Sequence, residues 1–210
     1  MRDLLIMRKT IDLASSPILY QREFTDASFA EDWDVRSGEW HVADGACWGT
    51  NPLPQPGCIL SRKEFPGNVL IDCFAATVKP STHDINVMWN AAWNDATNTR
   101  GMAYVAGIQG WWSGKVGIEK SPEYKLVAAT PSPWFEPEHE YHIQVGSVDG
   151  HCFVFVNDEL KLELIDPDPI NNHRFTRIGF EAFQSKVRIS RLTVRQIVWH
   201  ARNEQYTAEF

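Results

Sequence analysis

The sequence has no long apolar run and no cluster of basic residues. Near its start, residues 4–7 form an apolar run of only four residues between charged neighbours. That run is too short for the core of a secretory signal and far too short for a membrane span. Lys and Arg are scattered, and the formal net charge of the 210-residue chain is −7. We therefore expect a cytoplasmic protein with neither a nucleic-acid nor a membrane partner.

Clear metal and cofactor motifs are also missing, so we assign no cofactor and no metal site. The four cysteines lack any CxxC spacing and are expected to be reduced and partly buried: Cys47, Cys58, Cys73 and Cys152. His139 and His142 point to opposite faces of a strand, which favours an exposed edge over a metal cluster. The acids Asp166 and Asp168 lie in a DPDP run. They leave a structural calcium ion as an alternative to a rigid turn.

Helical periodicity is missing too, since nowhere does a 3.6-residue period continue for three turns. Short alternating segments separated by Gly, Asp and Pro fill the chain, and residues 43–45, 149–150 and 157–158 have the composition of hairpin turns. A short helix or turn is expected near residues 26–33. This pattern predicts an all-β, antiparallel two-sheet jelly-roll sandwich. We divide the chain into an N-terminal arm (1–17), the β-sandwich domain (18–198) and a C-terminal tail (199–210).

The segment of residues 84–93 organises the rest of the prediction. With a period of two, one face carries Ile85, Val87 and Trp89, and the other face carries short carboxylate and amide side chains. The apolar face belongs against a second sheet. Extending this parity to the other segments predicts a core that contains Trp89, Trp93, Tyr104, Ile118, Phe153, Phe155, Ile178 and Phe180.

Polar residues of the opposite parity converge on one predicted sheet face. Amides, an indole and two carboxylates share the outward parity: Asn86, Asn90, Gln109, Trp111, Glu119 and Glu181. Amides hold sugar hydroxyls and Trp stacks on sugar rings, so we expect a saccharide ligand in a groove on the concave sheet. Outward glycines on these strands suggest that something approaches the backbone closely. An ordinary solvated strand face remains the alternative for either glutamate.

Two carboxylates on this face suggest proton transfer. We expect Glu119 or Glu181 to act as general acid or base, assisted by His83 or Asp84 at the groove rim. Apolar groove walls would desolvate such a carboxylate and raise its pKa. The competing explanation is that Glu119 forms a surface ion pair with Lys115 or Lys120, which needs no function.

Three short motifs are similar to those of known families. They are Asp-Ile-Asn at 84–86, Phe-Val-Asn-Asp at 155–158 and Arg-Ile-Gly-Phe-Glu at 177–181. From about residue 19 to 198, the order of these pieces resembles concanavalin A-like lectin and glucanase sandwiches. Within that superfamily it resembles the YesU-like family, which is often associated with bacterial use of pectin-derived sugars. The hairpin at 40–45 is more distantly similar to the 3-keto-disaccharide hydrolase domain, whose motifs differ at residues 86–88, 181 and 183.

Three classes of function follow from the pattern and the resemblance. The favoured class is an enzyme, a hydrolase or lyase, that cleaves a small plant-derived saccharide. The second is a non-catalytic carbohydrate-binding sandwich, and the third is a structural or interaction domain without a sugar site. A stand-alone cytoplasmic chain favours the enzyme, because binding modules usually accompany secreted enzymes. The oligomeric state stays open.

Overall fold

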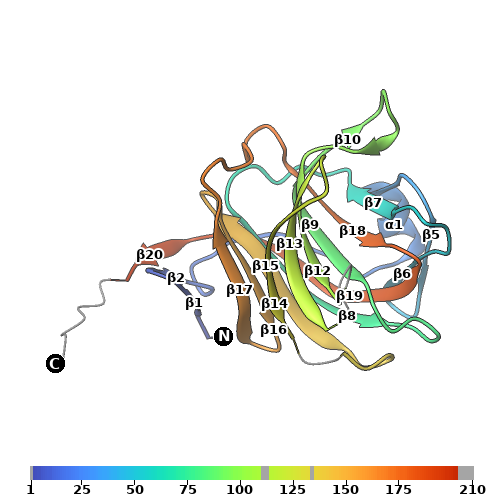
Figure 1. The fold of residues 1–210 in the computed structure, drawn as a ribbon, viewed down its shortest axis with the longest axis horizontal. Coiled ribbons are helices and arrows are strands. Elements are labelled where there is room, and N and C mark those ends of the chain that lie inside the picture. The colour runs from blue at the N-terminus through green and yellow to red at the C-terminus, as the bar shows by residue number, and fades with distance from the viewer. Residues whose placement is uncertain (1, 110–113, 133–134, 203–210) are drawn as a thin grey trace.

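Two antiparallel sheets pack face to face and form the body of the molecule (Figure 1). The computed structural model describes residues 2–109, 114–132 and 135–202. The predicted all-β, two-sheet sandwich is confirmed. No helix in the described part of the chain has the length and apolar content required to cross a membrane.

The first sheet has seven strands and contains the segment that organised the prediction. From edge to edge its order is β14 (Lys125–Pro131), β13 (Lys115–Ser121), β12 (Ala103–Ile108), β9 (Ile85–Ala91), β18 (Arg177–Ala182), β7 (Gly57–Ser61) and β4 (Trp33–Val35). Four of these strands, β13, β12, β9 and β18, are the ones whose outward polar residues the sequence brings together. Their adjacency confirms that they share one sheet.

The second sheet has eight strands and is built largely from hairpins. Its order is β17 (Glu159–Ile165), β16 (His151–Val156), β15 (Tyr141–Val148), β8 (Val69–Thr77), β19 (Ser185–Gln196), β6 (Ala46–Asn51) and β5 (Glu39–Ala43), and β3 (Ile18–Gln21) also pairs with β19. The three predicted hairpin turns are confirmed, because they join β5 to β6, β15 to β16 and β16 to β17.

Smaller elements lie around the sandwich. The N-terminal arm contributes β1 (Leu4–Ile6) and β2 (Lys9–Ile11), and β2 pairs with β20 (Trp199–Ala201), so both ends of the described chain meet in one small sheet (Figure 1). A two-stranded ribbon consists of β10 (Trp93–Asn94) and β11 (Thr99–Arg100). The helix α1 (Asp26–Asp32) confirms the predicted short helix, and Thr25 and Ser28 form a capping box at its start.

Five of the side chains predicted for the core lie between the two sheets. Residues of the main buried cluster include Trp89, Tyr104, Ile118, Ile178 and Phe180. Each comes from a strand of the seven-stranded sheet and lies on the face opposite to the polar residues. The predicted inward orientation of the apolar residues is therefore confirmed on these strands.

Three of the expected core residues are elsewhere. Phe153 and Phe155 are buried on the outer face of the eight-stranded sheet, in a second cluster with Leu4 and Ile11 of the arm. Because the arm covers that face, β16 is apolar on both sides and its parity does not identify the inner face. Trp93 is only partly buried and belongs to the ribbon β10–β11.

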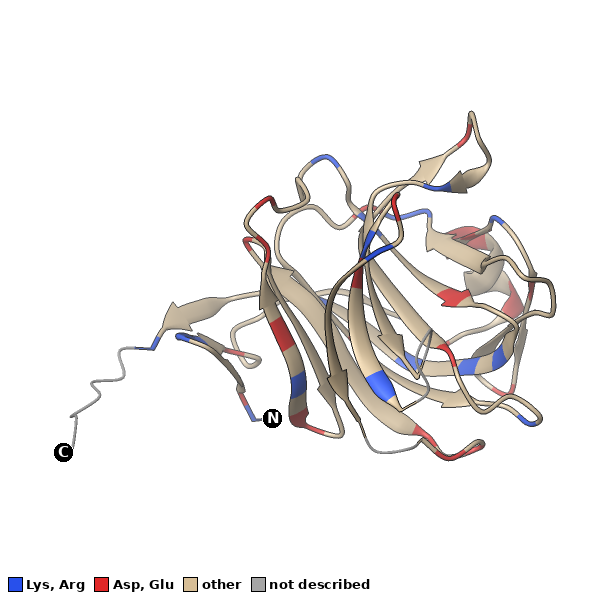
Figure 2. Ribbon diagram, in the orientation of Figure 1, with Lys and Arg blue, Asp and Glu red and all other residues tan. Residues whose placement is uncertain are grey.

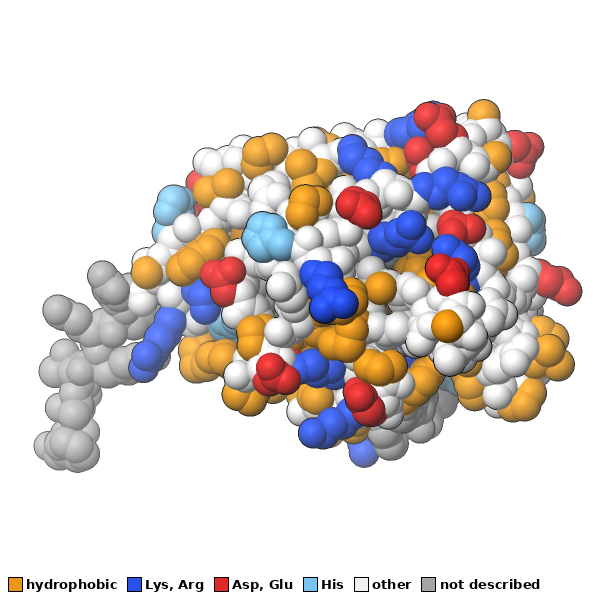
Figure 3. Space-filling model, turned by 90° about the horizontal axis from the view of Figure 1, so that it is seen from above, with side chains coloured by type: hydrophobic (Ala, Val, Ile, Leu, Met, Phe, Trp, Pro, Cys, Tyr) orange, Lys and Arg blue, Asp and Glu red, His pale blue; other side chains and the backbone are white. Residues whose placement is uncertain are grey.

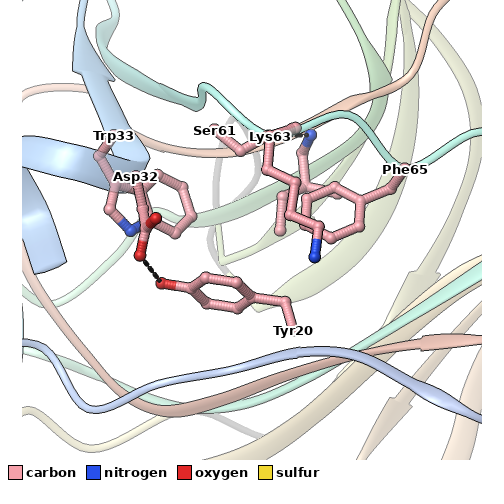
Figure 4. Close-up of a pocket in the computed structure, with 7 residues that line it drawn as sticks. Tyr20, Asp32, Trp33, Ser61, Lys63 and Phe65 are labelled. Carbon is pink, nitrogen blue, oxygen red and sulfur yellow. Dashed lines mark hydrogen bonds between the residues drawn. The ribbon is translucent and has the colours of Figure 1, made fainter.

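A narrow recess near α1 illustrates how the helix is held against the sandwich. Figure 4 shows the Tyr20 hydroxyl donating to Asp32 Oδ2 at 2.9 Å, beside the indole of Trp33. The Lys63 ammonium group donates to the Leu19 carbonyl at 2.6 Å and lies 5.7 Å from the centre of the Phe65 ring. These side chains fill the recess, which therefore serves packing rather than ligand binding.

Acidic and basic residues are distributed along the described chain. In Figure 2 they lie in loops and also within strands such as β17 and β19. In the view from above, acidic and basic side chains are interspersed (Figure 3). This distribution gives that face no basic stripe of the kind that follows a phosphate backbone.

Gly179 provides a test of packing on the outer face of the seven-stranded sheet. A Cβ at this position would lie 2.4 Å from the Ile59 carbonyl oxygen, whereas a Cβ at Gly107 would meet only Asn86 Oδ1, at 3.0 Å. The close approach to Gly179 thus comes from the neighbouring strand. We predict that Gly179→Ala lowers the free energy of unfolding by about 1–3 kcal/mol in urea denaturation. The matched control Gly107→Ala should cost clearly less, and equal costs would contradict this packing.

Candidate functional site

The outer face of the seven-stranded sheet carries polar side chains in an apolar surrounding. Asn86, Glu119 and Glu181 are each less than 8% exposed. A satellite cluster of small and medium apolar side chains lies around them: Cys58, Leu60, Met88, Ala91, Ala103 and Val105. The sequence predicted an exposed face here. It is instead buried, which makes each charged group on it electrostatically important.

A single arginine joins the two glutamates. Arg100, from β11, donates through one terminal nitrogen to Glu119 Oε1 and through the other to Glu181 Oε2. Its Nε donates to Ser121 Oγ at 2.9 Å, and that hydroxyl donates to Glu119 Oε1 at 3.0 Å. The side chain of Arg100 is 1% exposed. We call Arg100, Glu119, Ser121, Glu181 and Tyr124 the Arg100 cluster.

Tyr124 completes this cluster from the loop between β13 and β14. The guanidinium carbon of Arg100 lies 4.5 Å from the centre of the Tyr124 ring. Tyr124 has a left-handed backbone conformation, with φ of 54°, and is only half-buried. An aromatic ring over a desolvated guanidinium is a favourable cation–π contact. The cluster therefore presents an aromatic side chain toward solvent.

Burial and an excess of carboxylates raise the pKa values of the acids in this region. Desolvation, together with the nearby charges of Asp84 and Glu119, raises the pKa of Glu181 to about 7, against the opposing effect of Arg100. Desolvation likewise raises the pKa of Glu119. One guanidinium cannot neutralise three nearby carboxylates. Burial and the excess of negative charge therefore both favour the protonated form of these acids.

Asp84 is a structural anchor at the edge of this face. Its Oδ2 accepts from the Phe183 N–H at 2.7 Å, and its carbonyl oxygen accepts from Ser185 Oγ at 3.3 Å. These bonds tie the start of β9 to the turn between β18 and β19. Desolvation raises the pKa of Asp84 to about 6, while Asn86 and the Phe183 N–H counteract it. His83 is half-buried beside it, and its charge also lowers that pKa.

Two of the predicted ligand-binding amides are engaged within the protein. Asn86 is hydrogen-bonded to Asp84 and neighbours Glu181 across the strand pair β9–β18. The Gln109 side-chain nitrogen donates to the Thr82 carbonyl at 2.8 Å. Gln109 is 1% exposed and joins the segment before β9 to the end of β12. Asn86 is thus adjacent to a member of the Arg100 cluster, whereas Gln109 links two backbone segments.

Asn90 does not face outward as predicted. Its amide nitrogen donates to the Phe175 carbonyl at 3.3 Å, and its oxygen accepts from Ser147 Oγ at 3.4 Å. Ser147 belongs to the other sheet and also accepts from the Trp89 indole at 3.1 Å. Asn90 has a φ of 47°, and this left-handed residue ends the simple alternation of β9. The outward assignment of Asn90 is wrong.

The partners of Lys120 and Asp166 bear on two further expectations from the sequence. Lys120 binds Asp166 at 2.9 Å, and neither it nor Lys115 is the partner of Glu119. The Asp166 carboxylate also accepts from the Tyr104 hydroxyl at 2.6 Å and the Asp168 N–H at 2.9 Å, as in a braced turn. Within the described residues, no group of three or more His, Cys, Asp or Glu side chains is arranged to hold a metal ion. The predicted stacking residue Trp111 lies outside the described residues.

Arg100, Ser121 and Tyr124 are the members of the cluster that sequence reasoning missed. Arg100 belongs to a two-residue strand, and Tyr124 lies in a turn. Neither position belongs to a periodic segment, so parity assigns it to no face. The only available signal was chemical, because two carboxylates predicted on one sheet face favour a cation nearby.

Comparisons with known proteins establish the fold class. No protein-family model and no curated protein sequence matches the chain. Among solved structures, the chain is similar to a protein of unknown function with a galectin-like fold from Bacillus subtilis, with a TM-score of 0.67 and 16% identity over 86% of this chain and 96% of that one. It is also similar to the carbohydrate binding module CBM66 from Bacillus subtilis, with a TM-score of 0.63 and 13% identity over 78% and 95%.

A third similar structure is the carbohydrate recognition domain of Emp46p in its potassium-bound form. Its TM-score is 0.60, with 9% identity over 82% of this chain and 92% of that domain. At these identities the likeness concerns the fold alone. The chain therefore has a galectin-like sandwich fold, in agreement with the concanavalin A-like sandwich that the sequence resemblance predicted.

The raised pKa of Glu181 predicts a particular pH dependence of stability. The folded-state pKa, about 7, exceeds the ordinary value of 4.5. Stability from this group is therefore fully present below pH 4.5 and is lost as pH rises through 7. Glu181→Gln mimics the neutral acid and cannot ionise. Between pH 5 and 8, the stability of the variant relative to wild type should rise by on the order of 1–3 kcal/mol in urea denaturation. A difference that stays constant with pH would show that Glu181 is already ionised at pH 5.

Proposed function

We propose that the protein binds a small saccharide over the outer face of the seven-stranded sheet, with the Arg100 cluster as the polar centre of the site. The observation that carries this proposal is the half-buried Tyr124 ring stacked on a buried guanidinium between two carboxylates. A sugar presents apolar C–H faces and hydroxyl groups that both donate and accept hydrogen bonds. The aromatic ring complements the faces, and the charged groups complement the hydroxyls.

The unfavourable energetics of burying several charges in the cluster support a functional role. A buried network of one cation and two or three acids is rarely more stable than apolar side chains of similar volume. Its surroundings are apolar, so such a replacement would fit the site. Groups with shifted pKa values that gather in a buried site are candidates for ligand binding or catalysis. We take the Arg100 cluster to be retained for its ligand.

The names of two similar structures support carbohydrate as the ligand class. One is described as a carbohydrate binding module and another as a carbohydrate recognition domain. The proposal extends that ligand class to this chain. Membership of the YesU-like family and a cytoplasmic location belong to the same proposal. The location is consistent with four buried cysteines that form no disulfide in the described structure.

A glycoside hydrolase or lyase is the second candidate, and the titration of Glu181 favours it. A carboxyl group with a pKa of about 7 is suited to deliver or accept a proton at neutral pH. Glu119, on the other side of the same guanidinium, is the second carboxyl group that such chemistry uses. In this arrangement Arg100 occupies the space between the two acids. Catalysis would require the ligand to displace or share that contact.

Substitution of Tyr124 tests the binding proposal. Truncating a packed aromatic contact at the centre of a binding site typically costs more than about 1.4 kcal/mol, a tenfold loss of affinity. We expect Tyr124→Ala to weaken binding of the best ligand from an oligosaccharide panel at least about tenfold in isothermal titration calorimetry. The matched control is Trp48→Ala on the eight-stranded sheet. Trp48 is also half-buried, and Lys186 and Arg188 stack on it.

The control should leave saccharide affinity unchanged. If Trp48→Ala weakens binding and Tyr124→Ala does not, the ligand lies on the other sheet and the site assignment fails. If both variants bind like wild type while remaining folded, the aromatic platform is not Tyr124.

Glu181→Gln distinguishes an enzyme from a binding module. In an enzyme, loss of a general acid or base lowers turnover by roughly 10²–10⁴ while substrate binding is largely kept. Turnover should be followed by release of reducing ends or of unsaturated uronate from the panel. In a binding module no turnover exists, and the variant changes affinity alone. Full turnover by both Glu119→Gln and Glu181→Gln would eliminate the carboxylate mechanism.

A further inference from the structure

A cavity lies on the opposite side of the sandwich from the Arg100 cluster. It has a volume of about 430 Å³ and separates the N-terminal arm from the outer face of the eight-stranded sheet. Cavities of this size accept small molecules. Its apolar wall consists of Leu4, Leu5 and Leu13 from the arm and Phe155 from β16. The arm therefore completes a chamber that neither sheet forms alone.

The floor of this cavity is polar and comes from three neighbouring parts of the eight-stranded sheet. His142 on β15 is bonded through Nε2 to Asp72 Oδ1 on β8, at 2.9 Å. Its Nδ1 lies 3.1 Å from Asp158 Oδ1, in the turn between β16 and β17. Gln144 Nε2 donates to Asp72 Oδ2 at 2.8 Å. His142 thus lies in the middle of the sheet, partly buried, and not at the exposed edge that its sequence suggested.

Gln144 supplies the observation that points to a ligand. The residue is 3% exposed and lines the cavity. Its nitrogen is used by Asp72, but its Oε1 has no hydrogen-bond partner among the described residues. A buried carbonyl acceptor without a donor is rare, because the lost hydration is not replaced. The wall of the cavity therefore contains a buried acceptor whose missing donor a bound molecule can supply.

Acceptors outnumber donors around this cavity. Asp3, Asp72 and Asp158 contribute three carboxylates, against the single permanent cation of Arg2. The two ring nitrogens of His142 already face Asp72 and Asp158. The hydrogen bond to Asp72, with the charges of both acids, raises the pKa of His142, so the imidazolium form is favoured but is already paired. A complementary ligand brings N–H donors and positive charge.

We propose that this cavity binds a small organic ammonium ion. Its N–H groups would donate to Gln144 Oε1 and to the carboxylates of Asp72 and Asp158. Its hydrocarbon part would pack on Leu4, Leu13 and Phe155. An inorganic cation would leave the apolar wall without a partner, and an anion would meet the excess of carboxylates. The ligand class is that of alkylamines and diamines.

The test uses the full chain and 1,4-diaminobutane as the probe. Titration calorimetry should give saturable binding, and the side-chain amide resonance of Gln144 should shift in ¹H–¹⁵N spectra of the wild-type protein. The uncharged analogue 1,4-butanediol, of the same length, should produce neither effect. Gln144→Met keeps the size of the side chain and removes its acceptor. It should weaken diamine binding at least about tenfold, the usual effect of losing a hydrogen bond to a charged group.

The matched control is Asp44→Asn, compared with Asp158→Asn. Both aspartates lie in hairpin turns of the same sheet with a left-handed backbone, at φ of 52° and 64°. Asp158→Asn should weaken diamine binding and Asp44→Asn should not. Absence of binding to wild type at millimolar probe, or equal binding of the diol, would overturn the proposal. So would a diamine affinity that is the same in Gln144→Met and wild type, or a Gln144 resonance that does not move when the diamine binds.

Discussion

The structure depends on one guanidinium group held between two buried carboxylates. Arg100 belongs to a short ribbon, yet its side chain joins strands β13 and β18, which are separated by two other strands of the same sheet. Removing one member of such a network leaves an uncompensated charge in an apolar surrounding, at a typical cost of 3–5 kcal/mol. The outer face of the seven-stranded sheet is therefore organised by charge pairing, although its other side chains are mostly apolar.

Both sheets carry buried apolar side chains on their outer faces, but these side chains are covered in different ways. The outer face of the seven-stranded sheet is buried, with small and medium apolar side chains around the Arg100 cluster. The eight-stranded sheet buries part of its outer face beneath the N-terminal arm, whose leucine and isoleucine side chains pack on Phe153 and Phe155. Each covered face retains a set of polar groups that are not fully neutralised. This is why both faces are candidate sites, for ligands of different chemistry.

Much of the fold could be predicted from the sequence, because alternation and turn composition are local signals. Ile85, Val87 and Trp89 identified an inner face correctly, and the Asp-Gly and Asn-Asp turns located three hairpins. The prediction failed where a local signal ended or became ambiguous, as at the left-handed Asn90 and on β16 with two apolar faces. Arg100 could not be found, since its role arises from contacts between segments that are distant in sequence.

The most direct test of this account is a crystal structure of the protein soaked with its best saccharide ligand. The account predicts ligand density against the Tyr124 ring and within hydrogen-bonding distance of the Arg100 cluster. Density over Trp48 on the eight-stranded sheet, with the outer face of the seven-stranded sheet unchanged, would contradict it.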